Sequence, residues 1–278
     1  MEKMRRSERI AAITKTLLER PRQLFSLNHF TELLLSAKSN ISEDLGIIDE
    51  TLKSLGLGQL ETISGAAGGV KYVPGLRGEL SLEFLNQLCG KLTNPERILP
   101  GGFIYMNDLI FDPYISSKLG EVFATRFSQL TPDYIITVET KGIPLALMTA
   151  HSFSVPLVII RDNSNVSEGS SVSINYVSGS TRQIHTMSLS RRALPEHAKV
   201  LIIDDFMKAG GTARGMMDLM AEFNAQVLGI GVFIGTVEPR TKLVDNYVSL
   251  LELERVDGLT REVIIRPSQT LRLKTKEV

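Results

Sequence analysis

Apolar residues in the first 55 positions recur three or four residues apart, which is the spacing of one face of an α-helix. Three such runs follow one another and predict three short helices. The first run follows an N-cap residue at Ser7 and ends at Pro21, the second follows Ser26, and the third follows the polar turn 38–40 and ends at Gly56. The apolar positions of these helices are Ile10, Ile13, Leu17, Leu18, Phe30, Leu33, Leu34, Leu45, Ile48, Leu52 and Leu55.

A glycine-rich turn between two strand-like pieces follows the third helix. The segment 59–73 reads QLETISGAAGGVKYV, which predicts a β-hairpin, and Pro74-Gly75 marks a boundary after it. Three short helices and a hairpin in about 70 residues are typical of a winged helix, a variant of the helix-turn-helix. The alternative is a helical module for dimerisation or packing, since a fold does not by itself fix a function. We predict a winged-helix DNA-binding domain over residues 1–74 and a second domain over residues 75–278.

Beyond residue 75, apolar strand-like segments alternate with helical ones. Nearly all-apolar strands that alternate with helices are typical of a parallel sheet covered on both faces, so the predicted fold class of this domain is α/β. Ligands of such sheets bind beyond the C-terminal ends of the strands. The predicted strands cover 134–138, 157–160, 199–203 and 226–235, and the predicted helices cover 76–99, 115–127, 144–151 and 212–223.

Composition limits the classes of function that remain. The 278 residues include 31 Lys and Arg and 31 Asp and Glu, so the net charge is zero. This excludes a chain coated with basic charge for indiscriminate nucleic-acid binding, but it permits a local basic patch. A single cysteine, Cys89, cannot form an internal disulfide and favours a reducing compartment. The charged start of the chain does not resemble a signal peptide, and no run reaches the roughly 18 apolar residues of a membrane span, so we expect a soluble cytoplasmic protein.

The strongest chemical signal follows the most apolar of the predicted strands, in the sequence VLIIDDFMKAGGT. Two carboxylates, Asp204 and Asp205, come at the tip of this strand, and a loop of small residues then opens a helix. Gly210 and Gly211 let backbone N–H groups approach an anion closely, and Thr212 offers a hydroxyl to the same anion. Adjacent carboxylates suit a ribose diol or a magnesium ion. The alternative is an ordinary strand–turn–helix in which Asp caps the helix, and it leaves the second acid and the Gly-Gly-Thr sequence unexplained.

Basic side chains of the first domain stand where a winged helix contacts phosphates. Ten bases and nine acids give residues 1–74 a net charge of +1, so their placement supports DNA binding more than their number does. We expect the acids of the third helix to face solvent or a partner subunit, namely Glu43, Asp44, Asp49 and Glu50. The predicted phosphate contacts are Lys3, Arg5, Arg6, Arg9, Lys38 and Lys71, and the predicted base contacts are Ser39, Asn40 and Ser42.

The segment around Asp204 resembles the phosphoribosyl pyrophosphate (PRPP) motif of type I phosphoribosyltransferases. In that family the paired acids hold the ribose 2- and 3-hydroxyls, and the following loop cradles the 5-phosphate. The sequence 138–144, VETKGIP, is similar to the family's pyrophosphate loop, and segment 161–192 matches the position of its flexible hood, with alternating apolar residues that predict a hairpin lid. One departure is Lys208, which stands where the enzymes carry a small or hydroxylated residue. The chain also offers no evident general acid or base for a nucleobase, and the histidines show no metal-ligand spacing: His29, His151, His185 and His197.

A winged helix followed by DDFMKAGGT, PERILPGGFIYMND, ETKGIP and GSSVSINYVSG resembles the purine operon repressors of Gram-positive bacteria. The likeness covers nearly the whole chain and is weakest over the last forty or so residues. It implies a dimeric repressor of purine synthesis and salvage genes, with PRPP as an inducer that weakens operator binding, with or without Mg²⁺. Related members bind guanosine tetraphosphate in the same pocket beside aromatic residues. The implied effector-binding residues are Asp204, Asp205, Phe206, Met207, Lys208, Ala209, Gly210, Gly211, Thr212, Thr140, Lys141, Gly142, Phe103 and Tyr105.

Three functions therefore compete. The first is a PRPP-controlled DNA-binding repressor, which uses no cofactor as an enzyme would. The second is an active purine phosphoribosyltransferase with an N-terminal appendage, and the third is a module that binds another protein through its helical domain. Within the first, PRPP either shifts the population away from a DNA-competent state or competes with DNA phosphates for one basic surface. For Phe103 and Tyr105, ordinary core packing is the alternative to stacking on a nucleobase.

Overall fold

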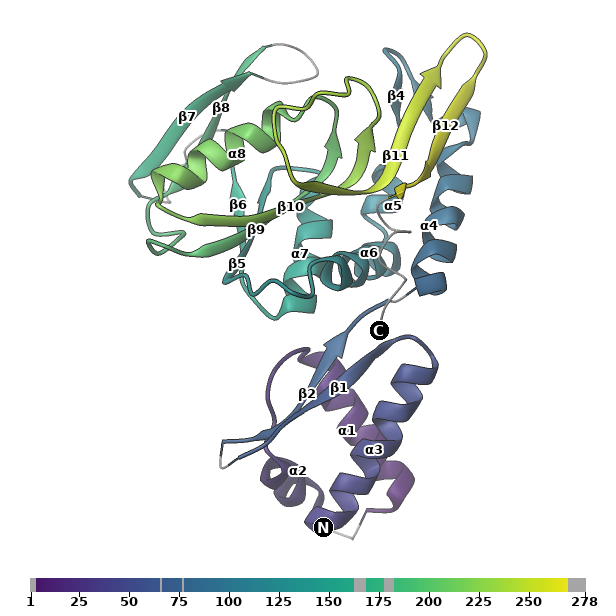
Figure 1. Ribbon diagram of the computed structural model, residues 1–278, viewed down its shortest axis with the longest axis vertical. Helices are drawn as coiled ribbons and strands as arrows, with labels where there is room; N and C mark the ends of the chain where they lie inside the picture. The colour runs from purple at the N-terminus through teal and green to yellow at the C-terminus, as the bar shows by residue number, and fades with distance from the viewer. Residues whose placement is uncertain (1–3, 66, 77, 163–168, 178–182, 270–278) are drawn as a thin grey trace.

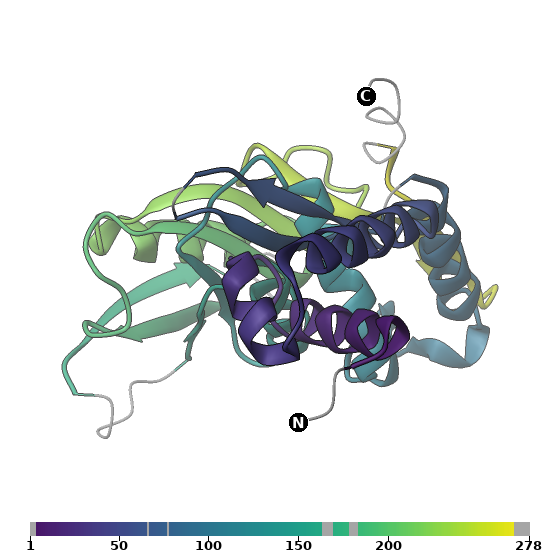
Figure 2. The ribbon, with the colours of Figure 1, turned by 90° about the horizontal axis from the view of Figure 1, so that it is seen from below.

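The computed structural model describes residues 4–65, 67–76, 78–162, 169–177 and 183–269. Two folded parts lie on either side of residues 74–76, the smaller below the larger in Figure 1 and nearest the viewer in Figure 2. In the smaller part, α1 and α2 pack on α3, and an antiparallel β1–β2 hairpin forms the wing. The elements of this winged-helix domain are α1 (Arg6–Glu19), α2 (Leu27–Leu34), α3 (Lys38–Ser54), β1 (Gly58–Ile63) and β2 (Gly69–Pro74).

Local capping explains where these helices begin and end. Ser26 caps α2 as predicted, because its hydroxyl accepts a hydrogen bond from the backbone N–H of His29 at 3.1 Å. The prediction that Ser7 caps α1 is wrong: Arg5 is the cap residue, and the Glu8 carboxylate accepts its N–H at 2.7 Å. The predicted polar turn 38–40 is instead the first turn of α3, since the helix begins at Lys38 with Ala37 as its N-cap.

A buried ion pair lies inside the apolar core of this domain. The Asp44 side chain is completely buried, and Arg9 grips both of its oxygens, with Nε at 2.7 Å and Nη2 at 3.3 Å. Asp49 turns to the wing, where it accepts the N–H of Leu60 at 2.7 Å. The prediction that all four acids of α3 face solvent or a partner subunit is therefore wrong for Asp44, because a guanidinium compensates its charge within the core.

The larger part is a six-stranded sheet with strand order β12-β11-β10-β9-β5-β6. Every pairing is parallel except that of β12 with β11, so the mainly parallel α/β prediction is confirmed and an antiparallel edge is added to it. A β3–β4 hairpin precedes the sheet in sequence, and a β7–β8 hairpin separates β6 from β9. The strands are β3 (Ile98–Leu99), β4 (Phe103–Ile104), β5 (Tyr134–Val138), β6 (Leu157–Ile160), β7 (Ser171–Val177), β8 (Ile184–Ser190), β9 (Lys199–Met207), β10 (Gln226–Thr236), β11 (Tyr247–Asp257) and β12 (Glu262–Pro267).

Alternating strand residues build a separate apolar layer on each face of the sheet. Ile135 and Leu201 pack with α4, α6 and α7 on one face, whereas Ile136 and Ile202 pack with α8 and the β7–β8 hairpin on the other (Figure 1). Both faces are thus covered, as the all-apolar strands predict. The helices of this part are α4 (Gly78–Leu92), the 3₁₀ turn η1 (Pro95–Arg97), α5 (Asn107–Ile110), α6 (Pro113–Arg126), α7 (Gly142–Phe153) and α8 (Gly211–Glu222).

One predicted helix and one predicted strand end at other residues in the structure, because other parts of the chain pair with them or follow them. The helix expected over 76–99 ends at Leu92, where η1 and the β3–β4 hairpin take over. Strand β9 continues beyond Ile203, because β10 remains its parallel partner as far as the Met207 and Gly235 pair. Within the described residues, none of the helices has the length and apolar character that crossing a membrane requires.

The two parts touch at the C-terminal end of α7. The guanidinium of Arg22, in the winged-helix domain, donates from Nε to the Ser152 carbonyl at 3.0 Å and lies 4.6 Å from the centre of the Phe153 ring. Burial lowers the pKa of Arg22. A second contact joins the backbone N–H of Leu76 to Thr125 Oγ1 at 3.2 Å. One end of α7 is therefore fixed to the winged-helix domain.

Arg9→Met is expected to destabilise the protein by about 3 kcal/mol, because it leaves the Asp44 carboxylate buried without its main partner. Arg6 lies at the surface, where 54% of its side chain is exposed, and its Nε lies 3.3 Å from Oδ1 of the same carboxylate. Arg6→Met is therefore the matched control and is expected to cost about 1 kcal/mol or less. Urea unfolding of both variants measures the difference, and equal losses would contradict a core role for Arg9.

Candidate functional site

Strand β9 places the paired carboxylates at the junction of β5, β9 and α7. Asp204 is buried, and its Oδ1 accepts the backbone N–H of Asp205 at 2.9 Å. The start of α7 packs directly against it: a Cβ atom on Gly142 would lie 3.0 Å from Asp204 Oδ1 and 2.4 Å from Thr137 Oγ1. Only glycine fits this approach, so Gly142 holds the pyrophosphate-like loop against the paired acids.

Burial governs the electrostatics of these acids. The pKa of Asp204 is raised well above its ordinary value, first by burial and then by the neighbouring Asp205 charge. Burial also raises the pKa of Asp205, although a hydrogen bond from Asp204 and the Lys141 ammonium oppose the rise. The pair therefore favours a bound proton, hydroxyl donors or a cation. Among the described residues, no group of three or more His, Cys, Asp and Glu side chains is placed to hold a metal ion.

The loop after β9 forms a small cradle at the start of α8. Gly210 has φ +85°, a left-handed conformation that favours glycine, and it turns the chain so that the N-terminus of α8 borders the cavity. The cavity holds about 60 Å³, room for a phosphate-sized group rather than a whole nucleotide. Its lining residues are Asp204, Phe206, Met207, Lys208, Ala209, Gly210, Gly211, Thr212, Ala213 and Val232.

The pyrophosphate-like loop meets this cradle. Thr140 and Lys141 are exposed between β5 and α7, and the Lys141 charge acts on Asp205. Two loops that are more than sixty residues apart in sequence thus border the same two carboxylates. The residues predicted in both loops come together in the structure, and their roles toward a ligand stay predictions.

Tyr176 is a site residue that the sequence analysis did not single out for the effector. It lies in the β7–β8 hairpin, which matches the predicted hood, although residues 178–182 at its tip lie outside the described residues. Its ring packs on Gly215 in α8, where an added Cβ would lie 2.9 Å from Cγ. Burial raises the pKa of Tyr176, and the side chain of Thr212, in the cradle, opposes that rise. The hood therefore packs against α8. A tyrosine in an alternating lid segment is the signal that could have indicated this contact.

The three aromatic residues that were predicted to bind the effector lie in two different places. Phe206 lines the cavity, but Phe103 and Tyr105 do not. Phe103 is 55% exposed and Tyr105 is 44% exposed, so the core-packing alternative is wrong for both, while Ile104 between them packs against the core. Phe103 and Tyr105 are therefore free on the surface of the β3–β4 region, and their stacking on a nucleobase stays a prediction.

The predicted DNA contacts divide into exposed and buried side chains. Arg5, Lys38, Ser39 and Ser42 are exposed, the last three on the N-terminal half of α3. Asn40 is partly buried and donates to Ser36 Oγ, in the turn that precedes α3. The predicted phosphate contact of Arg9 is wrong, because Arg9 is 8% exposed and bound to Asp44.

Two predicted phosphate contacts reach the surface with an acidic partner. Lys71 in the wing pairs with Glu61 at 3.0 Å, and Arg6 pairs with Glu43 at 3.4 Å. Exposed pairs of this kind are weak, so either cation can exchange its carboxylate for a DNA phosphate. Lys3 lies outside the described residues.

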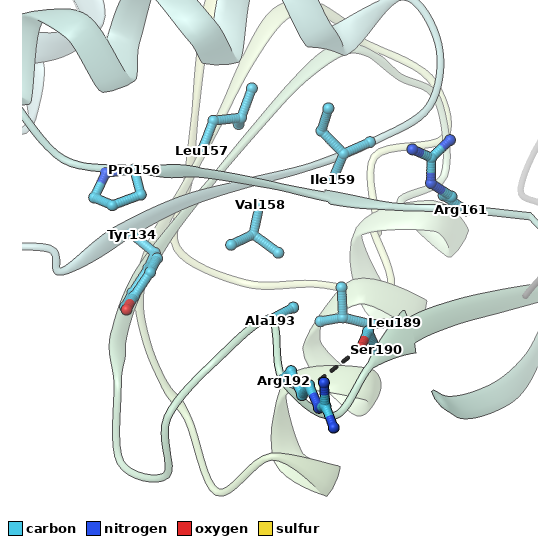
Figure 3. A pocket seen from close by; sticks show the side chains of 10 residues that line it. All are labelled: Tyr134, Pro156, Leu157, Val158, Ile159, Arg161, Leu189, Ser190, Arg192 and Ala193. Carbon is cyan, nitrogen blue, oxygen red and sulfur yellow. Dashed lines mark hydrogen bonds between the residues drawn. The ribbon is translucent and has the colours of Figure 1, made fainter. Parts of the chain in front are cut away.

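A larger cavity of about 510 Å³ lies along the free edge of β6 (Figure 3). Its floor is apolar, with Val158 and Leu189 facing into it, and Arg161 and Arg192 stand at its rim. None of the residues predicted for the effector line it. The Asp204 carboxylate, the Thr212 hydroxyl and the glycine-rich backbone line the smaller cavity, so it is the stronger candidate for a polar ligand.

Asp204→Asn is expected to stabilise the ligand-free protein at neutral pH, because burial disfavours the ionised carboxyl in the folded state. A carboxyl whose folded pKa is raised adds stability below its unfolded pKa of about 4 and loses it as pH rises through the folded value. The variant's advantage in melting temperature should therefore grow as pH rises above about 4, toward the raised folded pKa of Asp204. Asp108→Asn is the control of opposite sign, because Arg97 lowers the pKa of Asp108, and an advantage for Asp204→Asn that does not grow with pH would contradict the assignment.

Two family profiles match the chain. Residues 5–74 match the family described as bacterial purine repressor, N-terminal, and residues 110–262 match the phosphoribosyl transferase domain. The chain is also similar to the adenine phosphoribosyltransferase of Rhodothermus marinus in its solved structure, with a TM-score of 0.53 and 21% identity, over 63% of this chain and 100% of that one. At this identity, the likeness shows the fold of the larger domain.

Curated relatives extend the match to almost the full length. The chain is 48% identical to the purine biosynthesis transcriptional repressor PurR of Bacillus subtilis strain 168, over 97% of this chain and 95% of that protein. It is 38% identical to the purine biosynthesis transcriptional activator PurR of Lactococcus lactis strain IL1403, over 95% of this chain and 97% of that protein. The winged-helix domain, the phosphoribosyltransferase fold and these full-length relatives together show that the chain belongs to the bacterial purine repressor family.

Proposed function

We propose that this protein represses genes of purine synthesis and salvage by binding operator DNA, and that PRPP weakens this binding. The observation that carries the proposal is the meeting of three features around Asp204: a carboxylate pair in which Asp204 is buried and Asp205 partly buried, a glycine cradle at a helix start, and a lysine-bearing loop. Each suits one part of PRPP. A winged helix in the same chain supplies the DNA-binding surface.

The site accommodates the ligand by charge and hydrogen bonding. The ribose hydroxyls of PRPP donate to Asp204 and Asp205, whose raised pKa values reflect a need for such partners. Backbone N–H groups at the start of α8 and the Thr212 hydroxyl donate hydrogen bonds to the 5-phosphate. Lys141 faces the diphosphate. Asp204 or Asp205 would hold a magnesium ion, which takes few protein ligands and prefers oxygen, and the ion would supply positive charge beside the diphosphate.

We infer that the phosphoribosyltransferase fold senses PRPP here and does not consume it. The full-length relatives are transcriptional regulators by name, and the DNA-binding domain adds a surface that a transferase does not need. Lys208 in the cradle is exposed and adds a positive charge, which favours binding of the anion over its conversion to product. Guanosine tetraphosphate, which also carries diphosphates on a ribose, fits the same loops and would compete with PRPP, with its base near Phe206.

The route from ligand to DNA runs along α7. This helix begins at Gly142, against the carboxylate pair, and ends at Phe153, beside the contact with Arg22. In Figure 1 the winged-helix domain lies at the opposite end of the molecule from the β7–β8 hairpin that packs against α8. This separation favours a population shift over direct competition between PRPP and DNA. We propose a homodimer as the DNA-binding form, since two winged helices then read two half-sites.

Asp204→Ala combined with Asp205→Ala is expected to abolish PRPP-induced release while leaving operator binding intact. The double substitution removes the acceptors for the ribose hydroxyls and touches nothing in the winged helix. A gel shift of operator DNA against increasing PRPP measures the release. Release that persists in the double variant would show that the effector binds elsewhere.

The same preparation distinguishes a sensor from an enzyme. The wild-type protein, mixed with PRPP, Mg²⁺ and each purine base in turn, is expected to form no nucleotide at enzyme-like rates. Robust nucleotide formation would favour the rival function, an active purine phosphoribosyltransferase.

Replacing Arg5, Arg6 and Lys71 singly by Ala is expected to weaken operator binding, because each removes a cation from the proposed DNA surface, exposed for the two arginines and partly buried for Lys71. Each loss should lower the slope of log affinity against log salt by about one, the effect of one phosphate contact. Lys91→Ala, on the exposed side of α4 in the other domain, is the control and should leave the slope unchanged. Unchanged operator binding in all three variants would favour the protein-interaction module instead.

A further inference from the structure

The segment between β10 and β11 lies directly behind the phosphate cradle. Lys242, in this segment, extends its ammonium to three oxygen atoms: the Lys208 carbonyl at 2.5 Å, the Thr236 carbonyl at 2.8 Å and Thr236 Oγ1 at 3.2 Å. An ammonium has three hydrogens to donate, so these acceptors satisfy its full capacity. The side chain therefore links the end of β10 to the first peptide of the cradle.

The next residue continues the same contact. The Leu243 backbone N–H donates to the Ala209 carbonyl at 2.9 Å. Val244 packs beneath Gly210, where an added Cβ would lie 3.3 Å from its Cγ2. Two successive carbonyls of the cradle, those of residues 208 and 209, are thus held by residues 242 and 243.

These two contacts fix where the cradle's amides point. In a planar trans peptide, the carbonyl and the following N–H point in opposite directions, and the cis peptides found in the described chain lie elsewhere, before Thr140 and Pro239. With the Lys208 and Ala209 carbonyls turned toward residues 242–243, the N–H groups of Ala209 and Gly210 turn away from them. Successive N–H groups of this kind form a concave anion site beside the start of α8.

The two lysines of this region, Lys208 and Lys242, differ in their exposure and in what their ammonium groups contact. The Lys208 ammonium is exposed, while its backbone oxygen is held from behind. Lys242 is partly buried, and burial lowers its pKa, although Glu238 opposes that shift. Its charge is thus held behind the cradle, on the side away from the ligand.

We propose that Lys242 is a positioning residue for the phosphate cradle: with Leu243, it orients two consecutive peptide units so that their N–H groups face the 5-phosphate of the effector. This inference rests on the proposed function, because it assigns a further residue to the same site. Lys242 acts through the backbone and does not touch the ligand. Without its ammonium, the Lys208 carbonyl keeps only the longer hydrogen bond from Thr236 Oγ1 at 3.3 Å, and the cradle loses much of the orientation that binding needs.

Lys242→Met is the test, and Arg240→Met is its matched control. Both substitutions remove one positive charge from the same segment, but the Arg240 side chain is 89% exposed and pairs only with Glu238 at 3.4 Å among the contacts described. Calorimetry with PRPP is expected to show an affinity loss of about tenfold or more for Lys242→Met, the effect of one charge-assisted hydrogen bond. Arg240→Met should stay within about twofold of the wild type, as an exposed pair does.

Amide hydrogen exchange separates positioning from a general loss of structure. In the wild type, PRPP is expected to protect the amides of Ala209 and Gly210 together with the loop 140–142. In Lys242→Met at saturating PRPP, protection should remain at 140–142 and disappear at Ala209 and Gly210. Operator binding without PRPP should equal that of the wild type, which shows that the variant folds.

Lys242→Gln is the second variant, should Lys242→Met not fold. Its amide still donates to the Lys208 carbonyl but lacks the charge, so an intermediate affinity is expected. Wild-type affinity and wild-type protection in the Lys242 variants would overturn the inference, and so would an equal loss in Arg240→Met. A wild-type protein that shows no heat with PRPP would overturn the proposed function itself, a result distinct from either.

Discussion

The burial of the Asp204 carboxylate without a compensating cation is the constraint on which the effector site depends. Thr137 and Asp204 leave no room for a Cβ on Gly142, so the start of α7 and the end of β9 are packed closely together. The raised pKa means that ionising Asp204 is costly in the ligand-free folded protein. Hydroxyl donors or a cation bound beside it would offset that cost.

The winged-helix domain solves the same problem in the opposite way. Asp44 is as deeply buried as Asp204, but Arg9 meets both of its oxygens, and the pair becomes part of the core. A buried acid with an internal partner thus serves architecture, whereas one that has only another acid beside it serves recognition. The difference lies in the partner that the fold supplies and not in the residue type, which explains why charge counts along the chain could not separate the two.

Features whose residues lie within about a dozen positions of one another could be predicted from the sequence. Contacts between residues that are far apart in the chain could not. The acids, glycines and threonine from Asp204 to Thr212 stand together in sequence, as do the alternating residues of the hood hairpin. By contrast, Arg9 and Asp44 are 35 residues apart, and Lys242 meets Lys208 across 34 residues. The extension of β9 to Met207 likewise depends on pairing with Gly235. Contacts of this kind depend on how the strands and helices are arranged, and the local spacing of apolar residues does not show that arrangement.

The contact between Arg22 and the C-terminal end of α7 has an energy in the range that ligand control of DNA binding requires. Couplings between two sites in a protein are typically about 1–3 kcal/mol. A hydrogen bond from a charged donor contributes about 1.5–3 kcal/mol, and a cation over an aromatic ring about 0.5–2 kcal/mol. Arg22 makes one of each, to Ser152 and Phe153, at the end of the helix whose other end touches the carboxylate pair. This one contact therefore has an energy in the range of such couplings, so a displacement of α7 that weakened it would be sufficient to couple the carboxylate pair to the winged-helix domain.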